Sequence, residues 1–250
     1  MRLLVISDIH ANLAAFNAVL KHSAREWDRI LCLGDVVGYG PDPNECTELA
    51  AELCTVMLGG NHDLAAAGIM GIEAFSPHAR NAIIWTQSTL YARNSTFLSQ
   101  CTPQAEYGDM LLSHGGPEDP IWSYIFSESD AEAAFAGADF TRCLFGHTHI
   151  PSAFMAPVGA IPQSGAGFAC SVQYGNPDRI IETKTEGLRL LLNPGSVGFP
   201  RNSGEFHRLE NLSHASAQYA LFDTDTGRWR FKRTEYDMRD TAERMARLGL

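Results

Sequence analysis

The chain has 250 residues, of which 45% are hydrophobic and 19% charged, a composition that can bury a globular core without disulfide staples. Its formal net charge of −10 argues against nucleic-acid binding as the main task, because contact with phosphates needs a basic face. The apolar run at the N-terminus is too short for a signal peptide, and no run approaches the roughly 18 apolar residues of a membrane span. We therefore expect a cytoplasmic protein without a membrane partner.

The first 150 residues alternate between strand-like and helix-like segments. Short apolar runs predict strands over 2–6, 29–33, 55–59, 109–114 and 141–146. Helical spacing predicts a helix after an N-cap at Asn12, others over "NECTELAAELC" and "ESDAEAAFAGA", and a longer one over about 76–100. This alternation indicates parallel strands with helices outside them.

The pattern changes after residue 150. Strand-like runs follow one another without an obvious helix between them: "SAFMA", "FACSV", "LRLLLN", "YALFD" and "WRFKRTEY". Residues 225–227 predict a hairpin turn between the last two, and "DMRDTAERMARLG" predicts a closing helix. Because no linker or repeat interrupts the chain, we expect one domain over 1–250, with an α/β half (1–150) and a β-rich half (151–250).

Six cysteines are scattered along the chain without a CxxC spacing. We expect them to be reduced and mostly buried thiols rather than a disulfide framework or a zinc–thiolate site.

The stretch "LFGHTHIPS" (144–152) places two histidines where a predicted strand ends. The other predicted strands of the first half also end in polar residues, so that the set comprises Asp8, His10, Asp35, Asn61, His62, Asp63, His114, His147 and His149. In a parallel sheet the carboxyl ends of the strands share one edge, where ligands bind. A polar turn would explain any one of these endings, but it does not readily explain all five.

The ordered set Asp-x-His, Gly-Asp, Gly-Asn-His-Asp, His and Gly-His-x-His resembles the calcineurin-like metallophosphoesterases, with a match from Asp8 to His149. "NPGSVGFPR" (193–201) and the "YD" before the last helix are similar to the small bacterial and archaeal phosphodiesterase branch. The resemblance implies an α/β fold in which two packed mixed sheets carry helices on both outer faces, a four-layer α-β-β-α sandwich.

The resemblance also implies two divalent metal ions. The ligands would be Asp8, His10 and His149 for one ion, and Asn61, His114 and His147 for the other, with Asp35 bridging them. Carboxylate, amide and imidazole ligands suit manganese, which we expect first, or iron, zinc or nickel, rather than calcium. An extended backbone would let His147 and His149, two residues apart, point to the same side.

By the same resemblance, a hydroxide bridging the two ions would attack phosphorus in line. His62 would donate a proton to the leaving oxygen or support the transition state, and Asp63 would accept a hydrogen bond from His62 and hold its ring. The alternatives are a surface-loop histidine and a helix-cap carboxylate.

Weaker candidates surround this set. Tyr39 and Arg201 could contact the substrate, although a turn leading into a helix and a Pro-Gly turn are the simpler interpretations. Trp122, Tyr124 and Phe126 could stack on a nucleobase or pack locally.

We therefore expect a phosphoesterase for a small phosphodiester or nucleotide, with oligomerisation left open. A phosphomonoesterase or protein serine/threonine phosphatase is a weaker alternative, because "VVGYG" after Asp35 lacks the arginine of a "GDxxDRG"-type motif. A dinucleoside polyphosphate hydrolase lies between these two. A silent scaffold like the small retromer subunit would have lost ligands, whereas here every expected position is filled.

Overall fold

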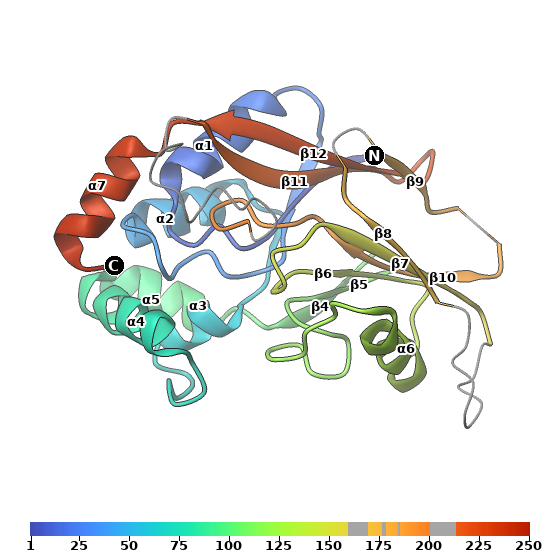
Figure 1. Cartoon of the computed structure of the whole chain (residues 1–250), viewed down its shortest axis with the longest axis horizontal. Helices are drawn as coiled ribbons and strands as arrows, with labels where there is room; N and C mark the ends of the chain where they lie inside the picture. The colour runs from blue at the N-terminus through green and yellow to red at the C-terminus, as the bar shows by residue number, and fades with distance from the viewer. Residues whose placement is uncertain (160–169, 177–178, 185, 201–213) are drawn as a thin grey trace.

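The computed structural model describes residues 1–159, 170–176, 179–184, 186–200 and 214–250, which form two six-stranded mixed sheets (Figure 1). The strand order of the first sheet is β3 (Val56–Met57), β2 (Arg29–Cys32), β1 (Arg2–Ile6), β11 (Ala215–Asp223), β12 (Arg228–Tyr236) and β9 (Ile180–Glu182). Strands β1, β2 and β3 are parallel, and β11 pairs antiparallel with β1. The predicted hairpin joins β11 to β12.

The second sheet has a similar arrangement. Its order is β4 (Gln104–Tyr107), β5 (Met110–Ser113), β6 (Arg142–Phe145), β10 (Leu188–Asn193), β7 (Ser152–Pro157) and β8 (Ser171–Tyr174). Here β5, β6 and β10 run parallel, and the other neighbouring pairs are antiparallel. Each sheet therefore combines strands from both halves of the chain.

Side-chain alternation along β1 divides its apolar residues between two cores. In β1, Leu3 and Val5 belong to the core between the sheets, whereas Leu4 and Ile6 pack on the other face. The opposite wall of the central core includes Leu144 and Leu192 of the second sheet. Both faces of β1 are apolar, which is why its sequence is a continuous apolar run.

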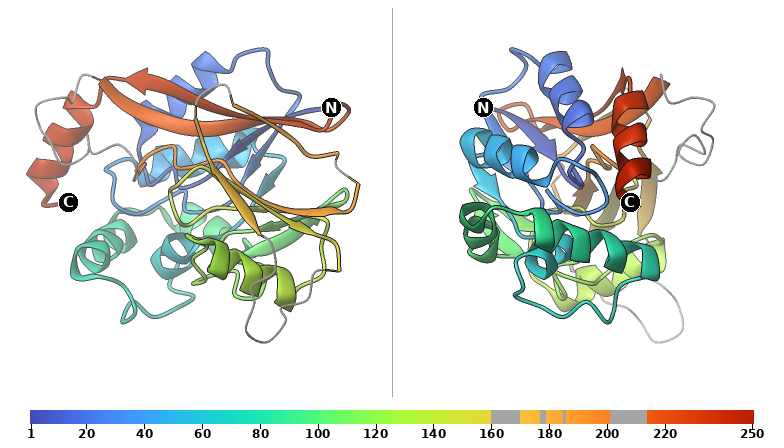
Figure 2. Two further views of the ribbon diagram at one scale, coloured as in Figure 1. Left: turned by 45° about the vertical axis from the view of Figure 1, so that its right-hand side comes forward. Right: turned by 90° about the vertical axis from the view of Figure 1, so that its left-hand side faces the viewer.

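Helices cover both outer faces. Helices α1 (Leu13–His22) and α2 (Pro43–Leu53) pack on the first sheet, and α6 (Glu128–Gly137) packs on the second, on the opposite side of the molecule (Figures 1 and 2). As predicted, Asn12 caps α1, since its side-chain oxygen accepts a hydrogen bond from the Ala15 amide at 3.1 Å. The α-β-β-α sandwich is thus confirmed.

The single helix predicted over 76–100 is wrong. The chain forms α4 (Pro77–Thr89) and α5 (Ala92–Ser99), separated by extended backbone at Leu90 and Tyr91. The Tyr91 amide donates a hydrogen bond to the side chain of Asn44 on α2, so a contact distant in sequence stabilises the break. A short helix, α3 (Asn61–Ala66), was not predicted at all.

The last helix, α7 (Arg239–Leu248), was predicted and lies at the same end of the molecule as α4 and α5 (Figure 2). All six cysteines are free, and three of them are buried. Within the described residues, none of the helices combines the length and the apolar character that crossing a membrane requires.

Candidate metal centre

The seven side chains expected to bind metal are all buried: Asp8, His10, Asp35, Asn61, His114, His147 and His149. They follow the C-terminal ends of β1, β2, β3, β5 and β6. The first three of these strands belong to one sheet and the last two to the other. The expected single parallel edge is therefore wrong, because both sheets contribute side chains to the cluster.

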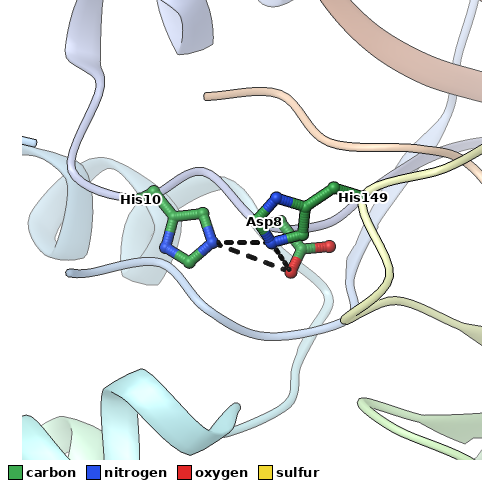
Figure 3. Close-up of side chains that lie close together, drawn as sticks. All are labelled: Asp8, His10 and His149. Carbon is green, nitrogen blue, oxygen red and sulfur yellow. Dashed lines mark hydrogen bonds and ion pairs between the residues drawn. The ribbon is translucent and has the colours of Figure 1, made fainter. Parts of the chain in front are cut away.

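Asp8, His10 and His149 form the first group of potential ligands, and Figure 3 shows all three side chains converging. The Nε2 atoms of His10 and His149 lie 3.0 Å apart. The Asp8 Oδ1 atom lies 3.3 Å from Nε2 of His149 and 3.9 Å from Nε2 of His10.

The hydrogen bonds behind these rings determine which nitrogens carry protons. Nδ1 of His10 lies 3.2 Å from the Val37 carbonyl, and Nδ1 of His149 lies 2.6 Å from the Phe199 carbonyl. Because a carbonyl can only accept, both Nδ1 atoms are donors, and the neutral form of either ring has its lone pair on Nε2. Two lone pairs then face each other beside the buried Oδ1 of Asp8, which has no hydrogen-bond partner among the described residues. A cation bound between these atoms would satisfy all three, so these residues fit a metal ion.

Asp35, His114 and His147 form the second group. Nδ1 of His114 donates a hydrogen bond to the Leu33 carbonyl at 2.9 Å. Its Nε2 lies 3.1 Å from Oδ1 of Asn61 and 3.5 Å from Oδ2 of Asp35. A carboxylate, an amide oxygen and two imidazoles thus converge, which is a donor set typical of transition metals.

Asp35 also belongs to a third group, with His10 and His62. Its Oδ2 lies 3.8 Å from Nε2 of His10, and its Oδ1 accepts a hydrogen bond from the His62 amide at 2.9 Å. This carboxylate therefore lies between the first two groups, where it could contact an ion in either one.

The buried charges of Asp35 and His114 stabilise each other. Burial raises the pKa of the Asp35 carboxyl, but the neighbouring His114 and His62 outweigh burial and hold this pKa well below its usual range. Burial likewise lowers the pKa of His114, yet Asp35 more than compensates and raises it to about 9. The field that favours a proton on His114 would equally favour a divalent cation beside Asp35.

Left-handed backbone conformations place many of these side chains. Positive φ angles of 50° to 63° occur at Asp8, His10, Asp35, His147 and His149. Non-glycine residues rarely adopt such angles, and they concentrate at functional sites. The extended backbone predicted for His147 and His149 is therefore wrong, although both side chains still reach the site.

The loop that carries these two histidines is held by Asn193. Its side-chain amide donates hydrogen bonds to the Gly146 carbonyl at 2.7 Å and to the Thr148 hydroxyl at 3.1 Å. The Ser196 hydroxyl donates to the Asp8 carbonyl at 2.8 Å. The segment after β10 thus returns to the site as far as residue 200, whereas Arg201 lies outside the described residues.

The expected hydrogen bond between His62 and Asp63 is not formed. Asp63 instead accepts from the amides of Val37 at 2.9 Å and Gly60 at 3.0 Å, which caps α3. Burial and the nearby Asp35 raise the pKa of Asp63 to about 7. Asp63 therefore stabilises the two loops around the site, as the helix-cap alternative had it.

His62 is buried rather than part of a surface loop, and its Nδ1 lacks a hydrogen-bond partner among the described residues. Gly38 packs directly against the ring: a Cβ at position 38 would lie 2.4 Å from Nδ1 of His62. Burial lowers the pKa of His62 to about 4, despite the opposing effect of Asp35. The imidazole is therefore neutral at neutral pH.

Aromatic side chains line this side of the site. The ring of Tyr39 lies 4.8 Å from that of His10 and 4.7 Å from that of His62, and it stacks on Phe199. The segment after Asp35 thus turns into α2, as the simpler interpretation had it, and it also places Tyr39 beside two site histidines. Phe199 and Asn193 were not assigned roles from the sequence.

Of the three aromatic residues that could stack on a nucleobase (Trp122, Tyr124 and Phe126), Trp122 packs locally. Trp122 packs edge-on against Phe75, with ring centroids 4.9 Å apart. Tyr124 stacks on His147 at 4.0 Å and on Phe126 at 5.2 Å.

Comparison with known proteins agrees with this fold and identifies the family. Residues 1–151 match the family model of the calcineurin-like phosphoesterases. The uncharacterized protein MJ0912 of Methanocaldococcus jannaschii is 32% identical over 249 residues, which cover 97% of this chain and 91% of that protein.

Two solved structures are similar over the whole chain. A metallophosphoesterase from Sphaerobacter thermophilus superposes with a TM-score of 0.80 at 37% identity, covering 100% of this chain and 94% of its own. The hypothetical protein PH1004 from Pyrococcus horikoshii OT3 gives a TM-score of 0.71 at 19% identity, with the same coverage of both chains, and shares the fold. The chain therefore belongs to the calcineurin-like phosphoesterase family, and this membership supports a metal-dependent phosphoesterase.

Proposed function

We propose that this chain hydrolyses a small phosphodiester or nucleotide and that it does so with two divalent metal ions. The observation that carries the proposal is the close approach of the Nε2 atoms of His10 and His149, 3.0 Å apart beside Oδ1 of Asp8, which has no hydrogen-bond partner in the described part of the chain. A second group of donors, Asp35, His114 and His147, is linked to the first because Oδ2 of Asp35 also lies 3.8 Å from Nε2 of His10. Two groups joined by one carboxylate support a dinuclear centre.

Asp8, His10 and His149 would hold one ion, and Asn61, His114 and His147 the other, with Asp35 between them. Two such ions lower the pKa of water and neutralise the charge of a phosphate group. We favour manganese, because the donors mix oxygen with imidazole nitrogen.

The residues also account for anion binding by an acidic chain. Only Asp8 and Asp35 are carboxylates among the proposed ligands, so they balance half of the charge of two divalent ions. With both ions bound, the site would keep a net positive charge that attracts a phosphate ester.

His62 lies beside this charge without being needed as a ligand. Its neutral ring can donate a hydrogen bond to the leaving oxygen, and a phosphate anion close by would raise its pKa toward the range useful for proton transfer. Gly38 and Tyr39 limit the movement of the ring.

A preference for diesters over monoesters rests on the segment after Asp35. Protein phosphatases of this superfamily usually carry an arginine in this segment, within a "GDxxDRG"-type motif. This chain instead has Gly38 and Tyr39 there, and both pack against His62.

The test compares hydrolysis of bis-p-nitrophenyl phosphate and p-nitrophenyl phosphate by manganese-reconstituted protein, together with metal analysis. We expect two ions per chain, a higher kcat/KM for the diester, and loss of turnover on chelation that manganese restores. A preference for the monoester would replace the phosphodiesterase with a phosphatase. Turnover that survives complete removal of metal would overturn the proposal.

A further inference from the structure

The loop between β5 and α6 exposes two aromatic rings next to the proposed metal centre. Tyr124 is 40% exposed and Phe126 is 39% exposed, although large apolar side chains usually avoid water. Ile125 between them is buried and joins the core beneath α6. The two outward rings are therefore presented by an anchored backbone.

The rings form a column that begins at a proposed metal ligand. Tyr124 stacks on His147 with a centroid distance of 4.0 Å and an interplanar angle of 29°. Phe126 continues the stack at 5.2 Å and is almost parallel to Tyr124, at 10°. The column thus leads outward from the proposed metal centre and ends at the exposed ring of Phe126.

Hydrogen bonds fix the outer end of this column. The amides of Phe126 and Ser127 both donate to Oδ2 of Asp130, at 3.0 Å and 2.9 Å, within the capping box of α6. The Tyr174 hydroxyl donates to the Phe126 carbonyl at 3.0 Å. Such an arrangement loses little conformational entropy when it binds a ligand.

We propose that Phe126, supported from behind by Tyr124, forms a stacking platform for the nucleobase of a nucleoside phosphate ester. The inference rests on the proposed function, which supplies the site for the phosphate. Stacking on an aromatic ring is open to every base, because each has a π-face, and one stacked base strengthens binding about 5- to 150-fold. The platform therefore selects nucleotides over aliphatic phosphate esters.

The experiment compares AMP with ribose 5-phosphate, which carries the same phosphate and sugar without the base. Both would be measured as competitive inhibitors of bis-p-nitrophenyl phosphate hydrolysis by the manganese-loaded protein. We expect AMP to bind at least about fivefold more tightly. Phe126→Leu should bring the two inhibition constants close together, and Phe126→Trp should keep them apart.

Tyr91→Leu is the matched control, because Tyr91 is 51% exposed on the distant junction of α4 and α5. It should leave the ratio of the two constants unchanged. Equal inhibition by AMP and ribose 5-phosphate in the unaltered protein would overturn the platform, as would a ratio that Phe126→Leu leaves intact.

The platform can fail or stand separately from the proposed function. If the protein hydrolyses no ester, calorimetry measures both affinities directly, without turnover. Tight AMP binding lost in Phe126→Leu would then keep the platform while the hydrolase proposal falls.

Discussion

Individual residues at the centre are oriented mostly by backbone atoms. The carbonyls of Val37, Leu33 and Phe199 each accept from Nδ1 of a different histidine and so fix its ring. Such contacts orient metal-binding imidazoles and choose the tautomer. The ring of His147 packs instead against two aromatic rings, those of Tyr124 and His114.

The role of His62 can be separated from metal binding. His62→Ala should lower kcat for the diester about 10²- to 10⁴-fold, because a positioned hydrogen-bond donor to the leaving oxygen is lost. The metal content, measured by elemental analysis, should stay at two ions per chain. His214→Ala, a change at an exposed histidine paired with Glu235, serves as the control and should keep full activity. Loss of an ion from His62→Ala would instead make His62 a ligand.

Residue identities could be predicted from the sequence, but their hydrogen bonds could not. The polar strand endings pointed to the right side chains, since strands and ligand types leave a pattern in sequence. Asp63 was given the wrong partner because its true donors are the amides of Val37 and Gly60. Every residue has a backbone amide, so nothing in the sequence marks these two.

Short connecting elements determine the shape of the site. The segment from Gly34 to Asp42 links β2 to α2 and brings Asp35, Gly38 and Tyr39 against the centre. Gly38 has a φ of 92° and touches the His62 ring, so this position must be both left-handed and without a side chain.

Two glycines allow the conformational and the steric effects to be compared. Gly38→Ala and Gly68→Ala should each destabilise the fold by about 1–2 kcal/mol, because both positions are left-handed. Gly68 has open space around it, whereas a Cβ at position 38 would strike His62. Gly38→Ala alone should therefore lower kcat/KM, by about 100-fold if the ring shifts by 1 Å. Equal activity of the two variants would contradict the contact.

Elements with a strong apolar pattern were predicted well, and those without one were missed. Strand β4 reads "QAEY" and β9 has three residues, so neither shows an apolar run. Both are edge strands that form because a neighbour offers hydrogen bonds. The break between α4 and α5 likewise depends on Asn44, nearly fifty residues away in sequence.

At the scale of the whole molecule, the proposed ions should contribute to stability. The facing nitrogens of His10 and His149 repel each other unless a cation or a proton lies between them. Metal ions bind these groups only in the folded chain, so binding stabilises the fold by mass action.

Chelation should therefore lower the melting temperature. At an ion concentration of about 100 times Kd, each ion adds about 2.7 kcal/mol, which corresponds to roughly 5–10 °C in a chain of this size. Differential scanning calorimetry with and without chelator measures the shift, and excess manganese should reverse it. An unchanged melting temperature would show that no ion binds at this strength.

The position of β1 in the middle of the first sheet has a consequence for synthesis. One edge of β1 pairs with β2 soon after it in the chain, but the other waits for β11, at residues 215–223. A ribosome adding about 5–20 residues per second needs about 10–40 s to reach that strand. Strand β6 similarly waits for β10. Through this interval the nascent chain carries one open sheet edge at β1, joined by a second at β6 until β10 is made; open edges are the kind of template on which chains aggregate. We expect chaperone dependence to be greatest before the last strands emerge, and a chain cut after residue 151 to keep both edges open permanently.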